Sequence, residues 1–312
     1  MAARSRAPTQ IDAMRAPRAA ASRRAWSTSG SIGAVGSSRP GTMTVSASTS
    51  RDRGFGTDSV VTNGVEIMSN NGCSATRRRR RRFLPWKHTT TKGHALLAQI
   101  VLFDGFDPLD VIAPFEVLSA GSDALDGALD VRLVGIDAPG PITSGTRGLV
   151  LHADDVLRPE EPGFVIVPGA SGPVEGDPDE IDTIPVLLSR LGETGLPALI
   201  RRAFAAPETT VATVCGGALA LAMAGLLEGR TAVTHRRGLD VLDATGVTVV
   251  DARGVDDGDL VSSGGVTSGL DLALYLLERS HGPRIAHAVE RLFEYERRGT
   301  VWRAVGADPL PF

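Results

Sequence analysis

Cys215 lies where a reactive thiol is expected, between a β-branched run and two glycines. The segment TVATVCGGALALAMAGLLEG, from Thr210 to Gly229, predicts a buried strand followed directly by a helix. The positive end of a helix and its free N–H groups stabilise an anion, so we expect a lowered thiol pKa at this turn. Gly216 and Gly217 allow a sharp backbone turn and close approach of a substrate, as in the strand–helix turn that carries the serine of many hydrolases. The alternative is a structural cysteine, because free cysteines are among the most buried residues.

The elements that position Cys215 follow a regular alternation from Ala95 onward. Continuous apolar runs such as ALLAQIVLF are typical of strands that a parallel sheet buries on both faces. Pro108–Gly121 predicts a helix that begins at proline and ends at glycine, and Ala218–Gly229 predicts another that ends at glycine. The other expected strands and helices are DVRLVGI, GFVIVPG, VTVV and DLVSSGG, and LPALIRRAFAA, GLDLALYLLERSHG and RIAHAVERLFEYERR. Together they predict an α/β fold with a doubly wound, mostly parallel sheet and helices on both faces.

Composition separates the chain into two parts. Residues 1–95 carry 17 Lys and Arg against 4 Asp and Glu, whereas the remainder carries 16 against 32. We expect residues 1–94, rich in Ser, Arg, Ala and Gly, to be a disordered basic extension, because they bury too little apolar surface to offset the entropy of ordering. Residues 95–300 are expected to form one domain, and 301–312 a C-terminal tail.

The basic run Arg77–Arg82 within the extension has two interpretations. Its charge would bind nucleic acid or anionic lipid. The alternative is a solvated tail, or an upstream extension produced by a misplaced start codon, with Met68 or a nearby codon as the true start. The run is similar to a twin-arginine export signal, but the apolar stretch that such a signal needs does not follow.

Three further observations bear on location, redox state and metal binding. Cys73 and Cys215 lie in regions of different character, which argues against a disulfide framework and fits a cytoplasmic protein. No apolar run reaches the roughly 18 residues needed to span a bilayer. The histidines show no metal-ligand spacing, so no metal site is expected.

Four segments, in order, resemble the ThiJ/PfpI family. They are VLFDGFDPLDVIAPFEVL, VIVPGASG, ATVCGGALALAMAGLLEGRTAVTH and VSSGGVTSGLDLALYLLE, and the resemblance covers about residues 97–298. Within the family the chain looks like the isonitrile hydratase-like branch, which also forms the sensor half of AraC-type transcription regulators. The resemblance implies a class I glutamine amidotransferase-like, flavodoxin-like fold, in agreement with the alternating pattern.

The resemblance also implies roles for individual residues. It makes Cys215 the nucleophile and places Asp110 against its thiol, where a protonated aspartic acid hydrogen-bonds a thiolate and delivers a proton to substrate. It assigns oxyanion binding to the backbone N–H groups of Gly169, Ala170 and Gly216. The alternatives are that Asp110 complements the dipole of its helix, and that the glycine loop is only a tight turn.

Five other side chains near these motifs receive interpretations. His235, 20 residues after Cys215, either deprotonates the thiol or packs beside the pocket or at a dimer contact. Thr267, with Ser268 beside it, is expected to cap the helix that follows rather than to bind substrate. Asp107 is expected to cap the first helix, and Glu116, one turn further along, is a weak rival to Asp110.

Gly216 departs from the patterns of known relatives. Relatives with protease- or glyoxalase-type activity often carry histidine directly after the cysteine, and the isonitrile hydratase pattern usually carries threonine there. Glycine supplies neither an imidazole nor a hydroxyl. The resemblance therefore leaves the substrate open.

Three functions remain after these observations. The leading one is a cofactor-free enzyme that adds water to an isonitrile or a related small electrophile through a covalent intermediate on Cys215. The second is a ligand or redox sensor related to the regulator branch, and the third is a stress-response chaperone or deglycase-like protein whose thiol is oxidised. A small-molecule electrophile is the expected partner, and a homodimer the expected assembly.

Overall fold

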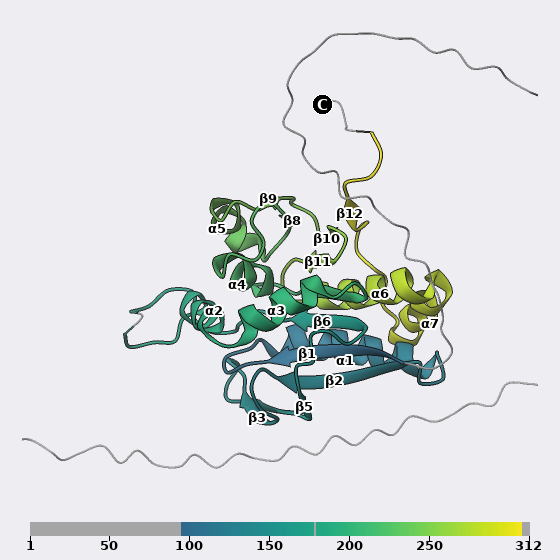
Figure 1. The fold of residues 1–312 in the computed structure, drawn as a ribbon, viewed down its shortest axis with the longest axis horizontal. Helices are drawn as coiled ribbons and strands as arrows, with labels where there is room; N and C mark the ends of the chain where they lie inside the picture. The colour runs from purple at the N-terminus through teal and green to yellow at the C-terminus, as the bar shows by residue number, and fades with distance from the viewer. Residues whose placement is uncertain (1–94, 178, 308–312) are drawn as a thin grey trace, which may run out of the picture. The chain divides into compact units, whose positions relative to one another are not determined.

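One large sheet forms the centre of the molecule, with its strands in a different order from the chain. The computed structural model describes residues 95–177 and 179–307, and within them an eight-stranded sheet runs in the order β12-β10-β11-β7-β6-β1-β2-β5 (Figure 1). All neighbouring pairs in it are parallel except β10 and β11, which are antiparallel. The strands are β1 (Leu96–Leu102), β2 (Leu129–Gly135), β5 (Asp155–Val156), β6 (Gly163–Val167), β7 (Thr209–Thr213), β10 (Gly254–Asp256), β11 (Leu260–Ser263) and β12 (Trp302–Arg303).

Two small two-stranded sheets lie outside the large one. An antiparallel pair joins β3 and β4, and a parallel pair joins β8 and β9. Their bounds are Gly140–Thr143 for β3, Val150–Ala153 for β4, Thr231–Ala232 for β8 and Thr248–Val249 for β9.

Helices pack in two groups, on the two faces of the large sheet (Figure 1). The first group is α1 (Pro108–Asp123), α6 (Ser268–His281) and α7 (Pro283–Phe293), which contact one another. The second is α2 (Ile184–Glu193), α3 (Leu196–Ala205), α4 (Gly217–Met223) and α5 (Leu239–Ala244), with the short 3-10 helix η1 (Arg236–Gly238) before α5. This arrangement confirms the doubly wound α/β fold.

The central strands are apolar throughout because both of their faces are covered. Every residue of β6 and β7 is buried, as is all of β1 except its first residue. Side chains such as Ile100, Val165 and Val211 are fully buried there and belong to one continuous core. A strand with apolar residues on both faces can lie only in the interior of such a sheet.

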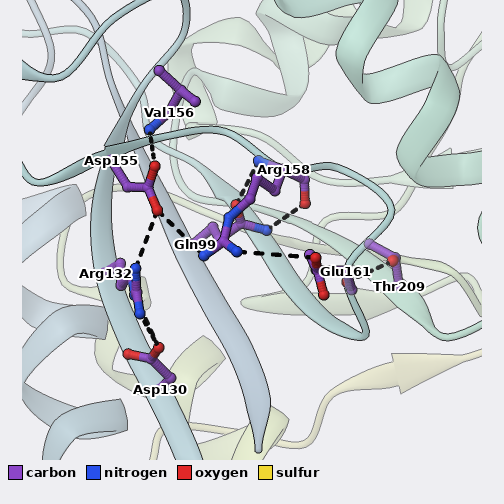
Figure 2. A network of polar contacts seen from close by, with 8 residues as sticks. All are labelled: Gln99, Asp130, Arg132, Asp155, Val156, Arg158, Glu161 and Thr209. Atoms are coloured by element: carbon purple, nitrogen blue, oxygen red, sulfur yellow. Dashed lines mark hydrogen bonds and ion pairs between the residues drawn. The ribbon is translucent and has the colours of Figure 1, made fainter. Parts of the chain in front are cut away.

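Gln99 is the polar exception within β1, and both the oxygen and the nitrogen of its side-chain amide are hydrogen-bonded (Figure 2). The side-chain carbonyl accepts from the N–H of Arg158 at 2.7 Å, and the side-chain amide donates to the carbonyl of the same residue at 2.8 Å. The Arg158 guanidinium also pairs with Asp155, which in turn binds Arg132 at 3.1 Å. Gln99 thereby ties the segment after β5 to the centre of the sheet without leaving its own amide unpaired.

Helix ends are where the sequence predictions fail most. The helix predicted over Ala218–Gly229 ends at Met223, because the backbone at Gly225 turns to a φ of +71°, which a helix cannot continue. Conversely, α1 runs past Gly121 to Asp123. Gly121 does not end its helix: a Cβ there would lie 2.5 Å from a methyl carbon of Leu277, so a larger residue would force that side chain to move where α1 packs on α6.

The ends of the chain differ from expectation in one respect. Trp302–Arg303, predicted as part of the tail 301–312, pairs in parallel with β10 as the edge strand β12. The predictions made for residues 1–94, including Arg77–Arg82 and Cys73, lie outside the described residues. Among the helices that the structure describes, none is long and apolar enough to cross a membrane.

Candidate active site

Cys215 lies on a strained turn at the carboxyl end of β7. Its φ is +54°, in the left-handed region that non-glycine residues rarely adopt, at a cost on the order of 1–3 kcal/mol. Its N–H is shared between the carbonyls of Ser263 at 3.2 Å and Gly264 at 3.0 Å, and its own carbonyl accepts from the Thr234 hydroxyl at 2.7 Å. These bonds hold the strained turn in place, and the side chain remains 8% exposed. The expected strand-to-helix turn is confirmed.

Asp110 lies fully buried in the first turn of α1, beside the Cys215 thiol. Its Oδ2 accepts from the Gly169 N–H at 3.0 Å, while its Oδ1 has no hydrogen-bond partner among the described residues. Burial, followed by the negative charge of Asp107, raises the pKa of Asp110 to about 8, although the Gly169 N–H and the thiol oppose the shift. Asp110 is therefore mainly a neutral acid at pH 7.

The thiol itself is poorly ionised at rest. Burial, and then the charge of Asp110, raises the pKa of Cys215 to about 12, against the N–H groups of Val266 and Gly216. The lowered thiol pKa predicted from the sequence is therefore wrong. The helix that was expected to stabilise the thiolate has only seven residues, and removal of the sulfur from water outweighs the two amides. Because the thiol is mostly protonated before the reaction, a group beside it must accept its proton as the sulfur attacks.

The glycine loop after β6 faces the same pair. Gly169 donates its N–H to Asp110, so that group is not free for an oxyanion while the bond persists. No acceptor takes the N–H of Ala170 within the described chain, and the N–H of Gly216 lowers the pKa of the neighbouring thiol. Oxyanion binding by these three residues stays a prediction, with Ala170 the amide most available for it.

The comparisons with known proteins agree with this geometry. A model of the DJ-1/PfpI family matches residues 189–279, a range that includes the Cys215 turn. The isonitrile hydratase of Pseudomonas putida is 34% identical over 204 residues, covering 64% of this chain and 79% of that protein. The chain belongs to the DJ-1/PfpI family. This is the family that the ThiJ/PfpI resemblance indicated.

One solved structure and one further relative in sequence extend the comparison. The structure of DJ-1beta from Drosophila melanogaster superposes with a TM-score of 0.54 at 19% identity, covering 65% of this chain and 99% of that chain, which supports the fold. The HTH-type transcriptional regulator CdhR of Pseudomonas aeruginosa is 33% identical over 101 residues, or 31% of this chain and 30% of the regulator. The similarity thus spans less than a third of that regulator's length.

His235 does not meet the thiol in this DJ-1/PfpI-family chain. Its Nδ1 accepts from the N–H of Arg237 at 3.2 Å and so caps η1. Its ring lies against Gly265, where a Cβ would be only 2.2 Å from Cδ2 of the imidazole. The groups that shift the thiol pKa are Asp110, Asp107 and two backbone amides, without the imidazole. Of the two interpretations, the structure favours packing beside the site.

Capping follows the sequence prediction at one helix and not at the other. Asp107 caps α1 by accepting from the Leu109 N–H at 2.9 Å, as expected. Thr267 occupies the N-cap position of α6 without a capping bond, and its hydroxyl accepts from Arg253 at 3.0 Å. The hydroxyl of Ser268 donates to the carbonyl of Gly265 at 3.0 Å.

Glu116 and Val266 differ from the sequence analysis in opposite ways. Glu116 is exposed on α1, so it is no rival to Asp110. The N–H of Val266 near the sulfur was not predicted, because every residue except proline has a backbone N–H and the residue type therefore does not indicate one.

A cavity of about 640 Å³ lies near the site. It is lined by Ser171, the residue after Ala170, but not by Cys215 itself. Among the described residues no group of three or more His, Cys, Asp or Glu is arranged to hold a metal ion.

Leu188 of α2 explains the glycine that follows the nucleophile. A Cβ at Gly216 would lie 3.0 Å from Cδ1 and 3.3 Å from Cδ2 of Leu188, which is 1% exposed. We expect Gly216→Ala to lower the free energy of unfolding by about 1 kcal/mol, because overpacking outweighs the reduced entropy of the unfolded chain. Leu188→Ala alone should cost about 2–5 kcal/mol.

A double-mutant cycle measured by urea unfolding checks this contact. The variant with both substitutions should lose less stability than the two single losses added together, because the new methyl group enters the space that leucine leaves. Strict additivity would contradict direct packing between positions 216 and 188.

Asp110 is also expected to make stability depend on pH. Its pKa is about 8 in the folded protein against 3.8 for the free side chain. Between these values the folded state keeps a proton that the unfolded chain has released, so the free energy of unfolding falls by about 1.4 kcal/mol per pH unit. This contribution is fully present below the lower pKa and is lost as the pH rises through about 8.

Urea unfolding of Asp110→Asn between about pH 5 and about pH 8 tests this dependence. The variant should show a flatter curve than the parent chain, because asparagine does not titrate. The control Glu116→Gln removes an exposed carboxyl from the same helix and should keep the parent slope. Parallel curves for the parent and Asp110→Asn would show that Asp110 ionises normally.

Proposed function

We propose that this chain adds water to an isonitrile or a related small electrophile through a covalent intermediate on Cys215. The observation that carries the proposal is the buried, neutral Asp110 directly beside a thiol that ionises poorly by itself. Isonitrile hydration requires a nucleophile and a proton at the same carbon, and this pair supplies both. The similarity to isonitrile hydratase supports the choice of substrate class.

The first step is addition of the thiol to the terminal carbon of the isonitrile. A bond forms between the Cys215 sulfur and that carbon, while Asp110 delivers its proton to the carbon and takes up the proton that the thiol loses. The product is a thioimidate, and Asp110 is again neutral. Because the thiol loses its proton only during the step, a standing thiolate is unnecessary.

The second step is hydrolysis of the thioimidate. Water adds to the same carbon while Asp110 passes its proton to the substrate nitrogen and takes one from the water, which leaves a hydroxyl on the carbon. The carbon–sulfur bond then breaks as Asp110 gives its proton to the sulfur and takes the proton of that hydroxyl, so that the carbonyl of the product forms and Asp110 is again neutral. An N-substituted formamide leaves, so the balance is one isonitrile and one water consumed for one formamide formed. Amides that include Ala170 N–H would stabilise the charge that develops.

A second candidate is a sensor that binds an electrophile or is oxidised at Cys215 without turnover. The similarity to an HTH-type transcriptional regulator over about a third of this chain favours it. The same pair would then serve recognition, with Asp110 donating to the modified sulfur. We further propose a homodimer acting in the cytoplasm, in line with the family resemblance.

Turnover distinguishes the two candidates. The full chain is incubated with a panel of alkyl and aryl isonitriles, and formamide release is followed by chromatography. The mass of the intact protein in quenched samples is measured by mass spectrometry. We expect formamide in excess of the protein and a mass increase equal to one isonitrile, mapped to Cys215. A stable adduct with no formamide release would support the sensor instead, and neither product nor adduct would contradict both.

A further inference from the structure

Arg253 holds both ends of the loop that faces Cys215. This facing loop, Gly264–Thr267, joins β11 to α6. At one end the Gly264 N–H donates to the carbonyl of Arg253 at 3.0 Å. At the other, Nη2 of Arg253 donates to the hydroxyl of Thr267 at 3.0 Å. A single residue outside the site thus fixes the span of this loop.

The facing loop contacts the cysteine through two kinds of bond. The carbonyl of Gly264 accepts from the Cys215 N–H at 3.0 Å, which helps to hold the strained turn. The N–H of Val266, between the two anchored ends, lies close enough to the sulfur to lower the pKa of the thiol. Any change in the span of the loop would therefore move a hydrogen-bond donor relative to the reacting atom.

Arg253 is in turn held by a buried carboxylate on α6. Its Nε donates to Oδ2 of Asp271 at 2.5 Å, and the side chains of the two residues are 24% and 9% exposed. The same oxygen accepts from the Tyr295 hydroxyl at 3.0 Å, and Oδ1 accepts from the Arg298 N–H at 2.8 Å. Hydrogen bonds to a buried charge are stronger and more directional than those in water.

We propose that Arg253, oriented by Asp271 and Tyr295, is a positioning residue that aims the Val266 N–H at the Cys215 sulfur. The inference rests on Cys215 as the reactive group of the proposed function, but not on the identity of the substrate. It connects the segment after α7 to the active site, although that segment contributes no side chain to the thiol's surroundings.

The test measures the alkylation of Cys215 by iodoacetamide as a function of pH. All variants are made in the full chain with Cys73→Ser, so that a single thiol reacts. Thr267→Val removes the acceptor for Arg253, Thr267→Ser retains it, and Tyr295→Phe removes the bond that helps to orient Asp271. Circular dichroism and thermal unfolding show which variants fold.

A matched tyrosine supplies the control. Tyr275 lines the same cavity of about 780 Å³ as Tyr295, and its hydroxyl binds another buried carboxylate, that of Asp256, at 2.6 Å. That carboxylate has no bond to Arg253 or to the facing loop in the described structure. The acidic groups that act on the thiol, Asp110 and Asp107 of α1, are unchanged in every variant.

We expect Thr267→Val and Tyr295→Phe to alkylate about fivefold more slowly at a given pH, with the rise in rate displaced to higher pH, because one hydrogen bond to the sulfur is weakened. Thr267→Ser and Tyr275→Phe should react at the parent rate. Parent behaviour of Thr267→Val would overturn the inference, as would equal slowing by Tyr275→Phe, which would indicate general loosening. If Thr267→Val does not fold, the pair of tyrosine variants decides by the same criteria.

The two proposals fail separately in this design. Absence of isonitrile turnover, with the order of alkylation rates as expected, would reject the proposed reaction and leave the positioning role standing. Turnover of isonitriles, with all variants alkylated alike, would reject the positioning role alone.

Discussion

Replacement of Cys215 by serine is expected to lower formamide release from an isonitrile by about 10³-fold or more. Serine is almost the same size and tolerates the φ of +54° about as well as cysteine, so the turn should survive. Its hydroxyl is a far weaker nucleophile than a thiol, and a neutral carboxyl such as Asp110 is too weak a base to activate it. The measurement is steady-state formamide release at pH 7, with thermal unfolding to confirm the fold.

The second cysteine of the chain is the matched control for this variant. Cys73→Ser makes the same chemical change outside the family-matched range and should leave turnover unaltered. Retention of more than about a tenth of the activity by Cys215→Ser would exclude a covalent intermediate at this position. Direct addition of water to the substrate, without a bond to residue 215, would then be the simpler mechanism.

Asp110→Asn should reduce turnover by about 10²- to 10⁴-fold, because asparagine accepts from the Gly169 N–H as aspartic acid does but has no proton to deliver. In the parent chain, turnover should decline as the pH rises through about 8, where Asp110 loses the proton that the first step requires. If Asp110 titrated near the ordinary value of a carboxyl, the same decline would instead lie near pH 4.

Asp107→Asn separates this role from a general effect of helix charge. Asparagine is as good an N-cap as aspartate, so α1 should stay intact and turnover at pH 7 should persist. Loss of the Asp107 charge, which helps to raise the pKa of Asp110, should move the alkaline decline to lower pH. A decline that stays in place in Asp107→Asn, or one that persists in a residually active Asp110→Asn, would show that another group titrates.

The raised pKa values of Asp110 and Cys215 have a common cause and a common consequence. Both groups are removed from water, which raises the pKa of each, and the charge of Asp110 further disfavours ionisation of the thiol. A proton that moves between them during the reaction avoids a separated charge in a poorly solvated site. The same burial explains the stability lost at high pH. The Asp110 carboxyl ionises readily in the unfolded chain but not in the folded site, so a rise in pH favours the unfolded state.

Much of the scaffold was predictable because it depends on local periodicity. The apolar runs at β1, β6 and β7 are buried on both faces, and the proline that opens α1 marks its start. The turn at Cys215 was also predictable, since a strand pattern ends there and two glycines follow. Helix ends were less so: Gly225 ends α4 early, while Gly121 serves packing against α6.

The sequence by itself determined the doubly wound fold, the position of Cys215 on its turn and the capping role of Asp107, because each depends on neighbours within a few residues. Only the tertiary structure decided the electrostatics of the site. Burial by distant segments raised the thiol pKa that local helix geometry was expected to lower, and a hydrogen bond across 59 positions tied Gly169 to Asp110. The Thr267 hydroxyl likewise accepts from Arg253, 14 positions away, and makes no capping bond. Desolvation and long-range hydrogen bonds sum over atoms that the folded chain brings together, and such sums cannot be obtained from the spacing of residues along it.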